Sequence, residues 1–280
     1  MTEKWGILFN GDKLSLNDIL VLSSRAEAGG AESVWAAELW RDAFVPLTAI
    51  ASTVGRVRLG TAVAHFARPP MLTELGAMSL SEYTAGRFIL GLGTAPKEWN
   101  EKWHGLDYKN PVKRMREYVE CIRTMWNGSP DQPVNYSGEF YSVRDYRRLT
   151  IPAYSNIPIY LAAVLPRMVQ LAGSLADGII LNVLNTPKYF TEIVHPNLAK
   201  GFTRRLTSNN NFEVCAVKCC AVNKDANHAR RLARHAIAFY ATLPYFDIVL
   251  DPMGFAEEKQ TIRQAMIQND VALMLDSVSD

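Results

Sequence analysis

Short apolar runs alternate along this chain with segments whose apolar residues recur every three or four positions. The first pattern is typical of buried strands and the second of amphipathic helices. Strands are predicted over residues 5–9, 33–37, 57–64, 86–94, 157–163, 177–182 and 212–222. Because helical segments separate them, the strands are expected to lie parallel in βαβ units. Seven such strands favour an α/β fold of the (β/α)8 TIM barrel type, with an open doubly wound sheet as the alternative.

Capping residues and breakers locate the helices that connect these strands. The helix after the third strand opens at Pro69-Pro70 and is expected to bury Leu72, Leu75 and Met78. The helices are expected from Ser15 or Asn17 to Gly29, Asp42 to Gly55, Pro69 to Gly86, Asn110 to Gly128, Pro166 to Leu175, and over 187–206 and 225–243.

One stretch interrupts the alternation. Residues 129–156 follow the fourth βα unit and carry two short strand patterns, 134–137 and 140–143, separated by Gly138. They predict a small hairpin inserted into the fold. Since no linker or change of composition marks a boundary, residues 1–280 are expected to form a single domain.

The fourth strand ends in a glycine pair, Gly91 and Gly93, that resembles part of a dinucleotide-binding fingerprint. That fingerprint requires a third glycine opening a helix, whereas Thr94, Ala95 and Pro96 follow here. A strand end without side chains lets backbone approach a neighbouring strand or a flat ligand closely. The stretch therefore indicates either tight strand packing or a planar ligand, and it excludes a pyrophosphate site at this turn.

The net charge of +2 and the scattered basic residues give no indication of nucleic acid or of an anionic membrane surface. No apolar run reaches the roughly 20 residues of a membrane span, and the N-terminus lacks a secretory pattern. The four cysteines, Cys121, Cys215, Cys219 and Cys220, do not have metal-ligand spacing. We expect a cytoplasmic protein with reduced cysteines and no metal.

Segments spread over most of the chain resemble the luciferase-like flavin and deazaflavin oxidoreductases. They are ESVWAAE (32–38), VRLGTAV (57–63), GRFILGLGT (86–94), EKWHG (101–105), REYVECIR (116–123) and IPIYLAAVLPRMVQLAGSLADGIILN (157–182). The EKWHG and REYVECIR segments are more similar to the deazaflavin-dependent branch than to the bacterial luciferases. The resemblance implies a (β/α)8 barrel. Because its eighth βα unit is not evident before Asp280, the resemblance also implies a C-terminally incomplete domain.

The resemblance also implies where a cofactor, coenzyme F420 (8-hydroxy-5-deazaflavin) or alternatively FMN, would lie. Its ring would rest against a bulge in the third strand, often with a cis peptide, that maps to Ala62 and Val63, and against Gly93 and Thr94. Its phosphate would be held by loops after the fifth and sixth strands. Those loops contain Ala163, Val164, Leu165, Arg167 and Asn182. Leu165 stands where relatives often have glycine.

Relatives commonly have an acidic residue followed by histidine at the end of the second strand, and this chain has Glu38 followed by Leu39. The catalytic candidates for proton transfer are therefore Glu38, His65 and His104. Each also has a structural interpretation: Glu38 as a carboxylate paired with Arg41 or Arg68, and the histidines as hydrogen-bonded loop anchors. Trp40 and Trp99 are candidates for the wall of the substrate pocket, or for simple packing of the loops.

The function expected from the resemblance is hydride exchange between coenzyme F420 and a small organic substrate, by an enzyme that is commonly a homodimer. Two alternatives stay open. One is an FMN-dependent monooxygenase that activates oxygen through a peroxyflavin. The other is a non-catalytic flavin-binding protein.

Overall fold

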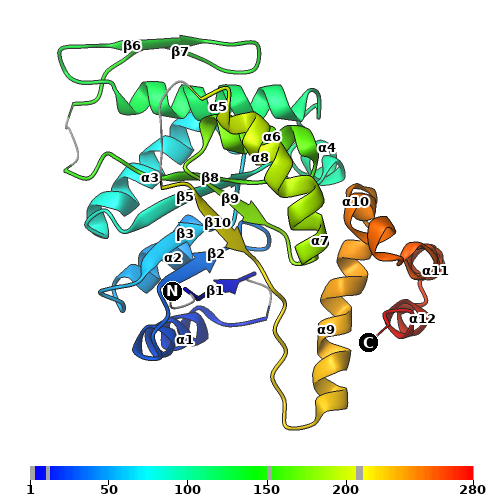
Figure 1. Cartoon of the computed structure of the whole chain (residues 1–280). Helices are drawn as coiled ribbons and strands as arrows, with labels where there is room; N and C mark the ends of the chain where they lie inside the picture. The colour runs from blue at the N-terminus through cyan, green and yellow to red at the C-terminus, as the bar shows by residue number, and fades with distance from the viewer. Residues whose placement is uncertain (1–3, 11–12, 150–152, 206–210, 280) are drawn as a thin grey trace. The chain divides into compact units, whose positions relative to one another are not determined.

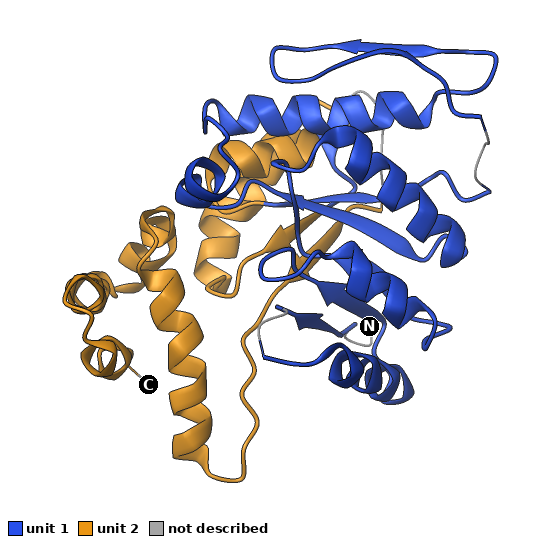
Figure 2. Ribbon diagram, turned by 180° about the vertical axis from the view of Figure 1, so that it is seen from behind, with its two compact units in different colours: residues 1–162, 175–178 blue, residues 163–174, 179–280 orange. Residues whose placement is uncertain are grey.

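The computed structural model describes residues 4–10, 13–149, 153–205 and 211–279 (Figure 1). The chain forms two compact units, Met1–Ala162 with Leu175–Gly178 and Ala163–Ser174 with Ile179–Asp280 (Figure 2). Parts of two predicted segments, residues 150–152 of the insertion and the end of the helix over 187–206, lie outside the described residues.

A parallel sheet forms the centre of the first unit. Its strands run in the order β1 (Gly6–Phe9), β2 (Ser33–Ala36), β3 (Arg58–Thr61), β5 (Phe88–Gly93) and β8 (Ile159–Ala162), and the short β4 (Ala64–His65) also pairs with β5. Every residue of β2 and β5 is buried. Burial on both faces explains why these strands are unbroken apolar runs in the sequence.

The helices of the first unit follow the predicted signals closely. Ser15 and Asp18 form a capping box at the start of the first helix. At the second, the Asp42 carboxylate accepts from the N–H groups of Phe44 and Val45, at 2.7 and 3.0 Å. The helices are α1 (Leu16–Ala28), α2 (Phe44–Ala51), α3 (Pro70–Tyr83), α4 (Lys97–Trp103) and α5 (Pro111–Trp126). Of these, α4 lies in a stretch where a loop was expected.

The buried face of α3 differs from the prediction. Leu72 and Leu75 are 51% and 44% exposed, while Thr73 and Glu74 are fully buried. The hydroxyl of Thr73 hydrogen-bonds to Tyr118 on α5 (2.5 Å), and the Glu74 carboxylate pairs with Arg148. Polar partners from distant segments therefore override the apolar periodicity that sets most helix orientations.

The predicted hairpin is present as β6 (Val134–Ser137) and β7 (Ser142–Tyr146), an antiparallel pair next to α5 (Figure 1). Two buried acids help to hold it. Glu117 of α5 accepts from the N–H of Phe140 at 2.7 Å, and Glu74 accepts from the Tyr146 hydroxyl at 3.3 Å. Because these acids are buried, the insertion is part of the packed unit.

The second unit is mostly helical. Two of its helices meet at glycines: a Cβ on Gly201 would lie 2.4 Å from the carbonyl oxygen of Gln170 and 2.8 Å from the Cα of Gly173. Its elements are α6 (Pro166–Leu175), β9 (Gly178–Leu181), α7 (Pro187–Tyr189), a π-helical turn (Phe190–Val194), α8 (His195–Phe202), β10 (Glu213–Ala216), α9 (Ala226–Ala241), α10 (Asp247–Leu250), α11 (Ala256–Ile267) and α12 (Val271–Asp276).

The strand predicted over 212–222 is too long, since β10 ends at Ala216. Beyond it the Lys218 ammonium bonds to the carbonyl of Asn185, and Cys219 and Cys220 are exposed free thiols. Apolar side chains in this part of the chain are solvated instead of forming a sheet face. The alternation of parallel strands and helices confirms the α/β class, while closure into a full barrel stays a prediction.

Candidate active site

A bulge interrupts the third strand where the sequence placed one. Gly60 pairs with Ile89 and Ala64 pairs with Leu92, so four steps along one strand match three along its neighbour. The peptide between Ala62 and Val63 is cis. The Thr61 hydroxyl bridges the gap, because it donates to the carbonyl of Gly91 at 2.7 Å and accepts from its N–H at 2.9 Å. A side chain thus replaces the main-chain bonds that the bulge removes.

Gly93 faces this bulge. A Cβ built on Gly93 would lie 2.4 Å from the Cγ2 of Val63 and 3.6 Å from the Cβ of Ala162. The missing side chain therefore first serves packing, since Val63 occupies the space. Ala62 and Val63 are both half-buried, so one side of the bulge is accessible to a ligand.

Glu38 follows β2 and reaches the same bulge. Its carboxylate Oε2 accepts from the N–H of His65 at 2.8 Å, and its own N–H donates to the carbonyl of Val63 at 3.2 Å. Burial raises the pKa of the Glu38 carboxyl, while the His65 N–H and the Arg68 charge partly offset that rise. The pairing with Arg68 that the sequence left open is present, with Nη1 3.4 Å from Oε1.

Arg68 is itself held on several sides. Its Nη1 lies 2.6 Å from Oδ2 of Asp42, and its guanidinium lies over the Phe44 ring, 4.8 Å from the centroid. Its carbonyl accepts from the buried Tyr118 hydroxyl at 2.9 Å. The cation beside Glu38 therefore has a fixed position.

The structure brings the two candidate histidines together. The rings of His65 and His104 meet edge to face, with centroids 6.5 Å apart. His65 is 9% exposed, and burial lowers its pKa to about 4, with the neighbouring His104 adding to the effect. The His65 side chain is therefore a neutral imidazole at neutral pH, which donates one hydrogen bond from one ring nitrogen and accepts one at the other.

A cluster of exposed tryptophans lies beside His104. Trp103 stacks on Trp99, with centroids 4.8 Å apart and planes inclined by 13°, and it lies 5.8 Å from Trp40. Trp40 is 61% exposed and Trp103 50%. Indole rings are seldom this exposed without a partner, so the cluster is suited to a planar or apolar ligand.

Thr94 directly follows β5, and its side chain hydrogen-bonds to Tyr108. Burial raises the pKa of Tyr108, and the bond to Thr94 opposes the rise. The Tyr108 ring also lies against Phe66, 6.1 Å between centroids. Pattern reasoning did not single out Tyr108, because nothing near it in sequence marks it as part of the site.

The five phosphate candidates lie in the second unit, at two neighbouring loops. Ala163 donates to the carbonyl of Ile180 at 3.3 Å, Val164 accepts from the Tyr189 hydroxyl at 2.5 Å, and Leu165 is exposed. Arg167 is in the first turn of α6. The Asn182 side chain bonds to the N–H of Leu184 at 3.3 Å and to Tyr240.

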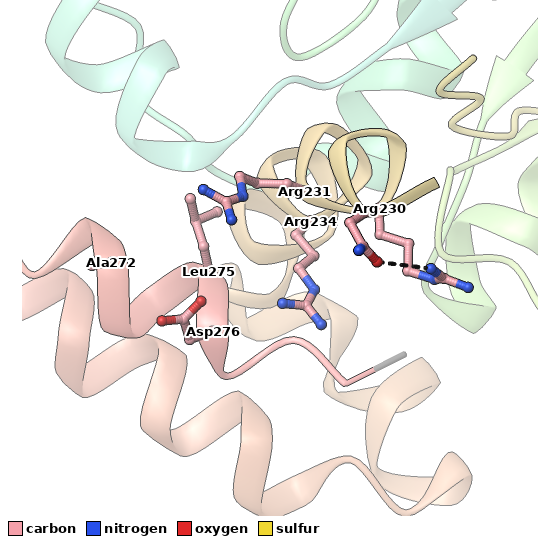
Figure 3. A pocket seen from close by; sticks show the side chains of 7 residues that line it. Arg230, Arg231, Arg234, Ala272, Leu275 and Asp276 are labelled. Atoms are coloured by element: carbon pink, nitrogen blue, oxygen red, sulfur yellow. Dashed lines mark hydrogen bonds between the residues drawn. The ribbon is translucent and has the colours of Figure 1, made fainter. Parts of the chain in front are cut away.

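A cavity of about 420 Å³ lies between α9 and α12 in the second unit (Figure 3). Arg230, Arg231 and Arg234 line it together with Ala272, Leu275 and Asp276, and Arg230 points away from Asp276 and donates to the side chain of Asn227 at 3.3 Å. The excess of guanidinium groups favours anions over cations there. Within the described ranges, no three His, Cys, Asp or Glu side chains converge as a metal site requires, and no helix is both long and apolar enough to span a bilayer.

Comparison with known proteins identifies the family. The luciferase-like monooxygenase family matches residues 7–279, so the chain belongs to it. A putative coenzyme F420-dependent oxidoreductase of Mycobacterium tuberculosis is 32% identical over 253 residues, covering 85% of this chain and 69% of the relative. The 5,10-methylenetetrahydromethanopterin reductase of Archaeoglobus fulgidus is 30% identical over 286 residues, covering 99% and 83%.

A solved structure agrees with this membership. The coenzyme F420-dependent tetrahydromethanopterin reductase of Methanopyrus kandleri superposes with a TM-score of 0.86 at 26% sequence identity, covering 99% of this chain and 83% of that chain. The resemblance found in the sequence is thereby confirmed for the family and for the α/β fold class.

Proposed function

We propose that this protein is a coenzyme F420-dependent oxidoreductase that exchanges a hydride between F420 and a small organic substrate. The observation that carries the proposal is the bulge at Ala62-Val63, a half-buried, side-chain-poor surface beside Gly93, in a chain whose relatives include enzymes named for F420. When bound, the deazaflavin supplies the hydride chemistry, and the protein binds, orients and excludes water.

The residues present fit such a cofactor. Ala62, Val63, Gly93 and Thr94 would contact the planar ring, since they leave one side of the bulge accessible. α6 begins at Pro166, which has no N–H, and the N–H groups of Met168 and Val169 already donate to the carbonyl of Leu165 at 3.0 and 3.1 Å. Arg167 is therefore the residue of this first turn whose main-chain N–H and guanidinium would suit an anion. Ala163, Val164, Leu165, Arg167 and Asn182 would hold the phosphate.

The substrate would meet the histidine pair and the tryptophans. Neutral His65 and its neighbour His104 would exchange or stabilise a proton on the substrate. Trp40 and Trp99, joined through Trp103, would form an apolar wall that keeps water from the reacting atoms.

Titration of the purified protein with F420 and, separately, with FMN tests the cofactor assignment. We expect saturable binding of F420 and weaker binding of FMN. Arg167→Ala should weaken F420 binding about fivefold, as expected for loss of one partly solvated phosphate contact, while the exposed Arg204→Ala should leave it unchanged. Tight FMN binding without F420 binding would refute the assignment and favour the peroxyflavin monooxygenase.

The non-catalytic alternative predicts a different result. Reduced F420 would then bind but would not be consumed in the presence of a panel of ketones, aldehydes and enones. Oxidation of reduced F420 by any member of that panel, in proportion to enzyme concentration, would exclude a purely binding role.

We also propose that residues 1–280 belong to one (β/α) barrel domain and that the protein is a homodimer. The exposed apolar side chains of α3 and α2 in the first unit, Leu72, Leu75 and Val45, support association. Light scattering should give twice the chain mass of 31.3 kDa. A Leu72→Glu variant with the chain mass alone would support this face as the contact.

A further inference from the structure

We propose that Glu38 is a positioning residue: it holds the end of the Ala62-Val63 bulge that leads to His65, so that the cofactor surface exists before the cofactor binds. The inference rests on the proposed function for the identity of the ligand, but not for the contacts. It also distinguishes Glu38 from His65 and His104, which are the groups proposed to face the substrate.

Two hydrogen bonds of Glu38 hold the second half of the bulge, whereas the first half is held by the Ala62 N–H, which donates to the carbonyl of Ala36 at 2.8 Å. The Glu38 N–H donates to the carbonyl of Val63, inside the bulge, and the Glu38 carboxylate accepts from the N–H of His65, two residues further on. The Phe66 N–H then donates to the carbonyl of Gly93 at 3.2 Å, where the regular ladder with β5 has resumed. Glu38, which follows β2, thus fixes residues 63–65, the part of this stretch that the Thr61 and Ala62 bonds do not reach.

The second carboxylate oxygen is not free to swing toward a substrate. Oε1 faces Arg68, and Arg68 is tied to Asp42, to the Phe44 ring and, through its carbonyl, to Tyr118. Tyr118 is in turn fixed by Thr73. A carboxylate with one oxygen on a main-chain N–H and the other beside an anchored guanidinium has both oxygens engaged in structural contacts.

The chemistry of this contact separates positioning from proton transfer. An acceptor oxygen is all that the His65 N–H requires, so the amide of Gln can replace the carboxylate. Arg68 keeps its close partner Asp42 after that change, and no charge is left unpaired. Ala at position 38 removes the acceptor and leaves a half-buried main-chain N–H unsatisfied.

Glu38→Gln, Glu38→Ala and the control Glu32→Ala test the proposal. Glu32 is a partly exposed carboxylate at the opposite end of β2, paired with Lys4. Two measurements are made on the full chain: the exchange rate of the His65 amide without cofactor, by NMR, and the dissociation constant of F420. For Glu38→Ala we expect exchange at least about tenfold faster and F420 binding at least about tenfold weaker. Glu38→Gln and Glu32→Ala should stay within about threefold of the wild type.

Several outcomes overturn the proposal. If Glu38→Ala leaves the His65 amide as protected as in the wild type, the clamp does not exist. If Glu38→Gln weakens F420 binding as much as Glu38→Ala does, the ionised carboxylate itself contacts the cofactor and Glu38 belongs to the binding site. If the wild type binds no F420, the proposed function fails, yet the amide exchange still decides whether Glu38 holds the bulge.

Discussion

Protonation of His65 should destabilise the fold, and the size of the effect follows from its burial. The folded-state pKa lies at about 4, against an ordinary value of 6.5. The unfolded chain therefore binds a proton between these two pH values that the folded chain rejects. The stabilisation that comes from the lowered pKa of His65 is fully present above pH 6.5 and is lost as the pH falls toward 4. At 1.36 kcal/mol per pKa unit, the loss is about 3 kcal/mol in full and about 2 kcal/mol at pH 5.

The assay is urea unfolding of the wild type and of His65→Gln at pH 7.5 and pH 5.0. Glu38 acts with the opposite sign, because the stability that its raised pKa provides is present at low pH and lost as the pH rises through that pKa. Both proteins keep Glu38, so its contribution cancels in the comparison. We expect the wild type to lose about 2 kcal/mol more than the variant between the two pH values.

The comparison uses the change in unfolding free energy between the two pH values, so any destabilisation that His65→Gln causes at both pH values cancels. NMR titration of the His65 ring gives the pKa directly and should show a midpoint near 4. Equal losses in the two proteins, or a ring that titrates near 6.5, would refute the reasoning that burial keeps this imidazole neutral.

Three further substitutions test contacts that hold the units. Gly201→Ala places a Cβ against the backbone of α6. Although alanine gains about 1 kcal/mol in helix propensity, the free energy of unfolding in urea should fall by about 2 kcal/mol net. The control Gly55→Ala, whose Cβ would have no atom within 4 Å, should leave that free energy unchanged. Arg148→Met leaves the buried Glu74 without its cation and should lower the free energy of unfolding by about 3–5 kcal/mol. Adding Glu74→Gln should restore much of that loss, and no restoration would contradict the idea that the unpaired carboxylate causes it. Gly93→Ala should cost about 1–3 kcal/mol by displacing Val63, and the double variant with Val63→Ala should recover most of it, since the two side chains compete for one space.

Much of the fold was predictable from local signals. The bounds of α6 and the location of α5, and the capping of α1 by Ser15, follow from prolines, capping residues and apolar spacing within one or two turns. The strand ends were also near their predicted positions, except for the strand predicted over 212–222, which ends at Ala216. Such signals fail where distant polar groups intervene, as on α3, where Thr73 and Glu74 are buried in place of Leu72 and Leu75.

The candidate site was predictable in its location and not in its contacts. Glu38 was identified at the end of a strand, His65 after the expected bulge and His104 in the EKWHG segment. In the structure His65 contacts both of the others. Sequence patterns did not identify the contacts of Tyr118 and Tyr108. Tyr118 meets Thr73 and Arg68, which lie 45 and 50 residues away in the chain, and Tyr108 itself lies outside the family segments. Trp103, which is not among the site residues predicted from the sequence, joins Trp40 to Trp99.

The sequence by itself determined the α/β class, the family and the place of the bulge. Strand and helix periodicity and the family segments are patterns of consecutive residues, so they can be recognised without knowing which distant residues meet. Only the tertiary structure decided what each site residue does. Gly93 makes room for Val63, Thr61 replaces a lost ladder bond, and Glu38 holds the His65 main chain. These roles depend on atoms that are some 27 to 30 residues apart in the chain and meet only when parallel strands pack side by side.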